Sequence, residues 1–462
     1  MPDLGDGALA EEAQARSSDS LPTPAATNGV LRNTPSTLRQ DYPPGCPVRT
    51  DVSALGGLQH RALVTGRPFP TARQLLEALP SECYVRSLWR SLGYASVSVV
   101  LTLVLGGLGY VLAARWPASL PSWSLPLQLL MWTVYAAVTG TVATGVWVCA
   151  HECGHGAFCE SVVVQDTIGW VLHSLLLVPY FSWQRSHAVH HSRTNHLDEG
   201  ETHVPHSAYA AAGQSNLWMH RMLGTDAFGV LNVLAHLLSG WPAYLLYGAT
   251  GGPVRGLTNH FVPLSMGRAA RQSTGEHLNA PMSLFPGRRW KLKVLLSDVG
   301  VLLVLAALVA WARTDGWRTM LLVYGGPYLV TNMWLVLYTW LQHTDVDVPH
   351  YGSEHWTWAK GALLTVDRPY PPLIDWLHHR IGSTHVAHHV CSRIPHYRAR
   401  LATIALRKAF PEYYLYDPTP IYRALWRVAS RCVVVAPVGD LWVYTASGER
   451  WVTVGSDERK LV

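Results

Sequence analysis

Three short histidine clusters are the residues of this chain best suited to chemistry. The first is His151 and His155, the second is His187, His190 and His191, and the third is His385, His388 and His389. Residues three or four apart share one face of a helix, so the rings of one cluster can reach one ion. Imidazole is a good ligand for iron, zinc or copper. A zinc site uses only about four ligands, so eight imidazoles favour two ions.

A ninth histidine, His343, follows a long apolar segment in the sequence LQHT and could add a further ligand. Its alternative role is that of an ordinary interfacial histidine. Metal-bound histidines usually donate their second N–H to a carboxylate or a carbonyl. The carboxylates that could serve the clusters in this way are Glu152, Asp166, Asp198, Glu201 and Asp367. Other nearby histidines are expected around the site or at the surface, and Cys153 is expected to be a packing residue.

The composition indicates that a membrane carries these clusters. Of the 462 residues, 49% are apolar and 14% are charged, whereas soluble domains carry about 25% charged residues. A helix needs about 20 mainly apolar residues to cross a bilayer. The net charge of +6 is modest, and basic residues lie between the apolar blocks, which favours membrane orientation over nucleic-acid binding. Four blocks are long enough: residues 93–114, 127–150, 294–312 and 319–341.

A fifth apolar block, residues 227–248, contains Pro242 and is treated differently. If it crossed the bilayer, the first two histidine clusters and the third would face opposite sides and could not share a metal site. The basic segment 249–293 would also face away from the cytosol, against the positive-inside tendency. We therefore predict that this block lies in the membrane interface, with both termini and all the clusters in the cytosol.

These observations predict an all-α integral membrane protein with four transmembrane helices in two hairpins. Interfacial helices and a cytosolic helical cap would hold the histidine-rich site. Residues 1–60 are rich in small and polar residues and in proline, which predicts a disordered cytosolic tail. We assign residues 61–430 to the membrane domain and residues 431–462 to a cytosolic C-terminal tail. The seven cysteines are an odd number without a repeating spacing, which disfavours a disulfide framework.

Longer motifs around the clusters resemble the membrane fatty-acid desaturase family, and in particular its microsomal oleate delta-12 (omega-6) branch. The similarity extends from about Pro68 to Pro420. The segments that carry it are His151–Phe158 (HECGHGAF), Leu172–Trp183 (LHSLLLVPYFSW), Tyr338–His343 (YTWLQH), Gly361–Arg368 (GALLTVDR), His385–His389 (HVAHH) and Pro395–Tyr397 (PHY).

The resemblance implies two iron ions on the cytosolic face of the endoplasmic reticulum membrane. It implies O2 as co-substrate, electrons from NADH through cytochrome b5 reductase and cytochrome b5, and a membrane acyl substrate. The product would carry a new cis double bond, at delta-12 of an oleoyl chain to give linoleoyl. The motifs assign the iron ligands as His151, His155, His187, His190, His191, His385, His388 and His389, with His343 added by its position.

Several alternatives stay open. Glu152 in the first cluster favours delta-12 over omega-3 (delta-15) desaturation, and His385 together with the lack of a His-Pro-Gly-Gly heme motif disfavours a front-end desaturase. Hydroxylases and acetylenases share the clusters. Gly200, Asn195 and the pair Ala188-Val189 depart from the usual pattern of the branch, which affects the regiochemistry. A metal transporter would place ligands inside the spans rather than beside them. The acyl carrier (phospholipid or coenzyme A) and a homodimer are also left open.

Overall fold

The computed structural model describes residues 47–49, 68–115, 124–263, 265–266, 282–438, 440–446 and 451–453. Within these ranges the chain is mainly helical, as the sequence predicts. The segment 1–60 that we assigned to a tail lies outside the described residues except for the backbone of β1 (Pro47–Arg49). That assignment stays a prediction.

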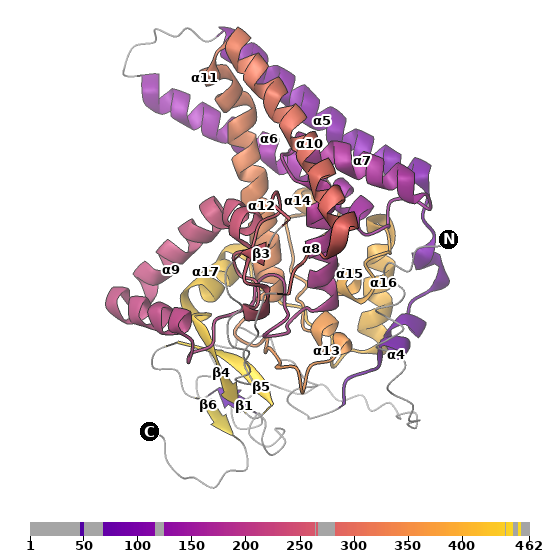
Figure 1. The fold of residues 1–462 in the computed structure, drawn as a ribbon, viewed down its shortest axis with the longest axis vertical. Helices are drawn as coiled ribbons and strands as arrows, with labels where there is room; N and C mark the ends of the chain where they lie inside the picture. Colours follow the sequence, from indigo (N-terminus) through magenta and orange to yellow (C-terminus); the bar gives the residue numbers. More distant parts are fainter. Residues whose placement is uncertain are drawn as a thin grey trace.

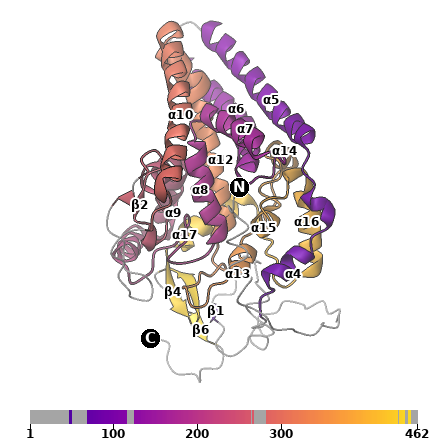
Figure 2. The same cartoon turned by 45° about the vertical axis from the view of Figure 1, so that its right-hand side comes forward.

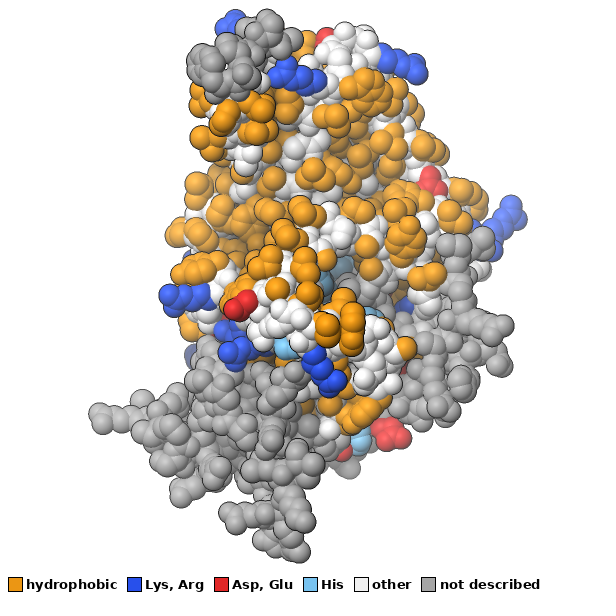
Figure 3. All heavy atoms as spheres, turned by 90° about the vertical axis from the view of Figure 1, so that its left-hand side faces the viewer, with side chains coloured by type: hydrophobic (Ala, Val, Ile, Leu, Met, Phe, Trp, Pro, Cys, Tyr) orange, Lys and Arg blue, Asp and Glu red, His pale blue; other side chains and the backbone are white. Residues whose placement is uncertain are grey.

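Long apolar helices form the upper part of the molecule (Figure 1). They are α5 (Leu88–Arg115), α6 (Leu125–Gly154), α10 (Gly287–Asp315) and the continuous run of α11 (Trp317–Met320), a π-helical turn (Leu321–Gly325) and α12 (Gly326–His343). Each covers one of the four predicted blocks. Hydrophobic side chains form a broad band over this part, with basic side chains above and below it (Figure 3). Such a band is the surface expected against hydrocarbon.

Five described helices are long and apolar enough to cross a membrane, and a sixth span results if one bent helix pair is counted. The bent pair is α7 (Val162–Leu175) and α8 (Tyr180–Ser192), whose axes differ by 105°. Leu177 in the turn between them has a φ of 54°, and Pro179 begins α8. The sharp turn directs α8 down toward the end of α6.

The fifth long helix is α9 (Ala211–Tyr247), which contains the apolar block with Pro242. Its first third is set off by a kink at Gly224, where φ is 75° and only glycine is unstrained. Figures 1 and 2 place α9 beside the lower half of the molecule, next to α17, while the other long helices extend upward. Leu237 packs with Leu337 and Val428 of the neighbouring helices.

The lower part is a helical cap. It consists of α4 (Ala72–Glu77), α13 (Trp358–Leu363), α14 (Pro372–Leu377), α15 (His385–Val390), α16 (His396–Ala409) and α17 (Ile421–Arg431), with short 3-10 turns at Ser81–Tyr84 and Pro253–Arg255. One apolar core, which includes Leu75, Leu363 and Leu406, joins α4, α13, α15 and α16. The cap thereby holds the short helix α15 against the membrane helices.

Three antiparallel pairs of short strands complete the fold. They are β1 with β6 (Trp451–Thr453), β2 (Leu257–Thr258) with β3 (Ser265–Met266), and β4 (Val434–Val438) with β5 (Leu441–Thr445). The β4–β5 hairpin lies in the segment that we assigned to a C-terminal tail. Val434 and Val435 are fully buried, so this part of the segment is folded onto the cap.

Helices α6 and α12 pack closely against each other. At Gly140 an added Cβ would lie 2.5 Å from the carbonyl oxygen of Pro327 and 2.6 Å from Cβ of Val330. Thr331 Oγ1 also donates to the Gly140 carbonyl at 3.1 Å. Small residues let membrane helices approach closely in this way. The contact fixes α6 and α12 against each other about three turns above His151 and His343.

We expect Gly140→Ala to destabilise the purified protein by about 1–3 kcal/mol, because the new methyl group has no space. Gly106→Ala in α5 is the matched control, since nothing lies within 4 Å of its added Cβ. That control should be neutral or slightly stabilising. Thermal unfolding of both variants in detergent measures the difference. Equal melting temperatures for the two would contradict the close contact.

Candidate metal centre

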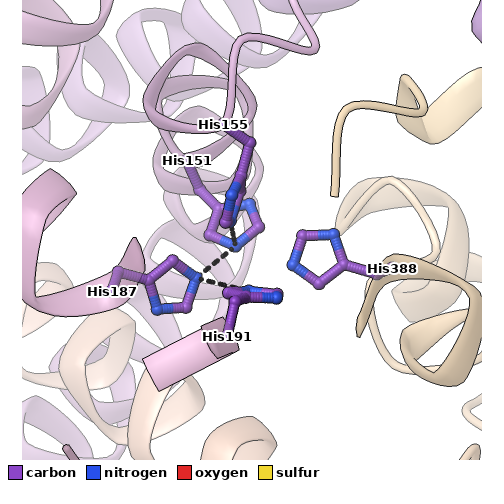
Figure 4. A group of neighbouring side chains, drawn as sticks. All are labelled: His151, His155, His187, His191 and His388. Atoms are coloured by element: carbon purple, nitrogen blue, oxygen red, sulfur yellow. Dashed lines mark hydrogen bonds between the residues drawn. The ribbon is translucent and has the colours of Figure 1, made fainter. Parts of the chain in front are cut away.

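Five of the predicted histidines form one group at the lower end of α6 (Figure 4). One ligand-type atom from each ring lies within 4.8 Å of the corresponding atoms of the other four. Nε2 of His187 lies 3.0 Å from Nε2 of His151 and 3.2 Å from Nε2 of His191. The members of the group are His151, His155, His187, His191 and His388.

The other four predicted histidines meet beside this group. His190, His343 and His389 form a second set whose ligand-type atoms lie within 4.8 Å of one another. His385 completes it, because its Nε2 lies 3.0 Å from Nε2 of His343. The rings of His191 and His389 stack with centroids 4.0 Å apart, so the two sets are adjacent. The structure thus brings together all nine histidines that the sequence nominated.

Four structural elements supply the rings. The last turn of α6 carries His151, and His155 is its C-cap residue. Helix α8 carries the second cluster, the last residue of α12 is His343, and α15 carries the third cluster. The spacing keeps His151 and His155 in one set, but the rings of the second and third clusters are divided between the two sets, unlike the prediction that one cluster serves one ion. On α8 the spacing sends His187 and His191 to the first set and His190 to the second.

Burial keeps these rings neutral. It lowers the pKa of His388 to about 3, and it lowers the pKa of His155, His385 and His389 well below the usual 6.5, helped by neighbouring histidines. A neutral imidazole presents a free lone pair, which an imidazolium does not. At pH 7 these nitrogens are therefore available as ligands.

Thr194 orients His389. The Thr194 hydroxyl donates its hydrogen to the carbonyl of His190 at 2.6 Å, so it must accept from Nδ1 of His389 at 3.2 Å. Nδ1 then carries the proton and Nε2 carries the lone pair. Nε2 of His389 is buried without a hydrogen-bond partner in the described part of the chain. The sequence analysis missed Thr194, although a hydroxyl three residues after His191 was a usable signal.

Three of the five predicted carboxylates have their hydrogen bonds with groups other than the histidine rings. Glu152 comes within 3.9 Å of Nδ1 of His151, but its hydrogen bond, at 2.8 Å, is with the backbone N–H of His396. Asp166 accepts from Tyr180 and Gln184. Asp367 accepts from the N–H of Val386 at 2.8 Å and thereby supports the first turn of α15. Among the described residues, Nδ1 of His151, His191, His343 and His385 has no hydrogen-bond partner.

Histidines outside the three clusters are mostly buried rather than exposed. His173 is fully buried between Trp147 and Trp183, and Trp183 stacks on His187 with centroids 4.6 Å apart. These histidines were expected around the site or at the surface, and His173, His196, His378 and His379 are all buried. His378 fixes the cap to the spans through Tyr338 and the carbonyl of Thr141. Cys153 is buried in an apolar cluster, as predicted.

A buried ionic network lies directly below His343. Arg368 contacts both Asp345, at 2.7 Å, and Asp417, and its Nε donates to the carbonyl of Leu341 at 2.9 Å. Arg427 lies 2.6 Å from each of the same two carboxylates. Burial opposes ionisation of Asp345, but the two arginines hold its pKa below the usual value. Two positive and two negative groups balance, and they fix the chain on either side of the site.

Sequence reasoning missed this network. Its signal was the charged residues next to the predicted ligands, namely Asp345 beside His343 and Arg368 beside Asp367. Their partners could not be inferred, because Arg368 is 49 residues from Asp417 and Arg427 is 82 residues from Asp345.

The donor set fits metal ions. Facing ring nitrogens are 3.0 to 3.2 Å apart. Two ligands at about 2.1 Å from one ion and at right angles to each other would be separated by about 3.0 Å. A single N–H can satisfy one pair of nitrogens, whereas His187 faces two others at once. Uncharged imidazoles without carboxylates suit iron, zinc or copper.

The fold and this site define a multi-pass, mainly helical membrane protein with a histidine-rich metal centre. The family model for fatty acid desaturases matches residues 127–420. Delta(12)-fatty-acid desaturase of Arabidopsis thaliana is 39% identical over 79% of this chain and 87% of its own length. An endoplasmic reticulum omega-6 fatty acid desaturase of Glycine max is 40% identical, covering 81% of this chain and 88% of the relative. Oleoyl-12-hydroxylase of Ricinus communis is 37% identical, covering 82% and 89%.

The chain therefore belongs to the fatty acid desaturase family. This confirms the resemblance that the histidine motifs indicated, and it makes the protein an oxidoreductase that acts on acyl lipids. The family and the two histidine sets together are consistent with a pair of iron ions.

We expect Arg368→Met to destabilise the protein by about 3–5 kcal/mol, because Arg427 alone would face two buried carboxylates. Arg73→Met is the matched control, since it breaks only an exposed pair with Glu77, whose contribution is typically below about 1 kcal/mol. Thermal unfolding of both purified variants is the measurement. A melting temperature for Arg368→Met as high as that of the control would show that the network is not needed.

Proposed function

We propose that this protein is a di-iron fatty acyl desaturase that introduces a cis double bond at delta-12 of an oleoyl chain. The observation that carries the proposal is the convergence of nine buried or partly buried histidines, in sets of five and four, in a member of the desaturase family. His151, His155, His187, His191 and His388 would hold one iron, and His190, His343, His385 and His389 would hold the other.

Bound iron would supply the O2-dependent oxidation that removes two hydrogens from an unactivated methylene pair. The protein must hold the ligand nitrogens unprotonated, which burial achieves for His385, His388 and His389. It must also exclude water from the reacting chain. The cap does this, since seven of the nine histidines are buried, and His155 and His187 are partly buried. Trp183 packs against His187 and closes one side of the first set.

The delta-12 position rests on the names of the relatives. Several of them are named delta-12 or omega-6 desaturases, at 38–40% identity. The hydroxylase of Ricinus communis is nearly as similar. Hydroxylation at the same carbon is therefore the second candidate, and delta-15 desaturation or acetylene formation are further outcomes on the same scaffold. Either phospholipid or acyl-CoA would be a chemically suitable carrier.

We further propose four spans, with the metal centre and both termini on the cytosolic side of the endoplasmic reticulum. Three observations support this: the location of α9 beside the cap (Figure 1), the histidines at the lower ends of α6 and α12, and the basic residues between α9 and α10. Electrons would come from NADH through cytochrome b5 reductase and cytochrome b5, whose acidic surface the basic cytosolic face would attract. A homodimer is compatible with this arrangement.

Expression in a yeast without polyunsaturated lipids tests the reaction. We expect 18:2 with double bonds at carbons 9 and 12, located by mass spectrometry of the acyl chains. His151→Ala and His389→Ala, one from each set, should lose at least about 100-fold of this product and bind less iron, while staying in the membrane. His206→Ala, outside both sets, is the control. A hydroxy product would favour the second candidate, and near-normal turnover in both variants would contradict the ligand assignment.

Glycosylation mapping tests the four-span topology. An N-glycan acceptor placed between Arg115 and Ser124 should be modified, because this connection would face the lumen. The same acceptor inserted at Met282, between α9 and α10, should stay unmodified. Glycosylation at Met282 would mean that α9 crosses the bilayer, and the four-span count would then be wrong.

A further inference from the structure

The lower end of α5 lies near α14 (Figure 2), and side chains of α5, α6 and α14 line a groove outside the metal centre there. Its volume is about 450 Å3, within the range of small-molecule sites. Val97, Leu101 and Val142 are among the apolar side chains that line it, and Ser98 and His379 form its floor. One side is open, because α5 turns most of its apolar side chains outward.

The mouth of the groove is basic. Arg90 lines it, with its guanidinium 4.5 Å from the ring centroid of Tyr397. Arg380 directly follows His379, whose ring centroid lies 4.6 Å from that of His396, and Tyr94 of the groove packs against the same ring at 4.7 Å. Neither guanidinium forms an ion pair with a carboxylate of the described chain, although Arg380 acts on Asp375 through space. Two arginines without carboxylate partners suit an anionic group.

The backbone at the floor of the groove is strained. His379 and Arg380 have φ values of 52° and 64°, and neither is glycine. Such backbone costs about 1–3 kcal/mol for each residue and persists where the surroundings enforce it. Here Nε2 of His379 is held by Ser98 at 2.9 Å and by Cys149 at 3.3 Å. The turn thereby presents the floor histidine and the mouth arginine to the same groove.

The position of the groove relative to the bilayer indicates which molecule would occupy it. Trp89 is 81% exposed and Trp376 is 50% exposed beside the mouth, and exposed tryptophan favours the level of the lipid headgroups. From Arg90 to Leu101 the groove follows α5 for about 16 Å, close to the depth of one leaflet, about 15 Å. A lipid with its phosphate at the arginines would therefore lay one acyl chain along Val97.

We propose that this groove binds a glycerophospholipid of the bilayer, with the phosphate at Arg90 and Arg380 and one acyl chain along α5. The site is separate from the histidines and requires neither iron nor electrons. Its occupancy can therefore be measured independently of the proposed desaturation, and it would persist in His151→Ala. Two segments link the groove to the metal centre: α6, where Cys149 at the floor precedes His151 by two residues, and the turn at His379, which leads into α15.

Photolabelling of the full chain in nanodiscs tests the proposal. The probe is phosphatidylcholine with a photoreactive group in one acyl chain, and labelled peptides are mapped by mass spectrometry. We expect label on residues 93–101 and on α14. Val97→Trp should fill the groove and remove this label. Val104→Trp is the control, because residue 104 lies two turns further along the same face of α5 and does not line the groove. Equal labelling in the two variants would overturn the site.

Competition tests the phosphate contact without any substitution. Unlabelled phosphatidylcholine should displace the probe, whereas diacylglycerol, which has no anionic group, should compete about tenfold less well because it lacks the phosphate. Arg90→Gln should remove this preference, and Arg115→Gln at the other end of α5 should keep it. Equal competition by diacylglycerol in the unmodified protein would refute the headgroup assignment.

If Val97→Trp fails to fold, Leu101→Phe replaces it in the photolabelling experiment, with the same expected loss of label on residues 93–101.

Discussion

Nine imidazoles must share a small volume without carrying charge, and the rest of the structure follows from this constraint. Their ring centroids are as close as 4.0 to 4.9 Å. Nine protonated rings at such distances would repel one another strongly in a buried site. Burial solves the problem by disfavouring the charged form, so that each ring keeps a lone pair. Access of water would remove this advantage, which is why the centre needs a cap as well as the helices that carry it.

Two kinds of contact hold the histidine-bearing elements in place. Between the spans the contact is close helix packing, since α6 and α12 touch at Gly140 and bring His151 and His343 to the same level. In the cap the contacts are polar. The network around Arg368 fixes the chain after His343, and Asp367 supports the first turn of α15. A six-residue helix such as α15 could not be stable alone. Its geometry depends on these distant partners and on the apolar core around Leu363.

Much of the fold and the site could be predicted because their signals are local. Twenty-residue apolar runs predict helices, and the spacing of His187, His190 and His191 predicts a shared helix face. His343 was nominated only by its place at the end of a span, and it lies 3.1 Å from Nε2 of His190. What could not be predicted depends on long-range contacts. The partners of Arg368, the π-helical turn at Leu321–Gly325 and the hairpin of β4 and β5 arise from tertiary packing. Glu152, Asp166 and Asp367, which were expected at the rings, have other hydrogen-bond partners, because sequence proximity does not determine orientation.

Membership in the desaturase family assigns the histidine sets to metal binding for an oxidation. The identity and number of the metal ions held by these imidazoles remain to be measured. Iron analysis combined with X-ray absorption of the purified, unmodified protein addresses it most directly. Our account predicts two iron ions for each chain, with a first shell dominated by nitrogen at imidazole distances. A fully active protein that contains zinc or a single iron, or iron with a mainly oxygen shell, would contradict the central claim that the nine neutral imidazoles together hold a pair of irons.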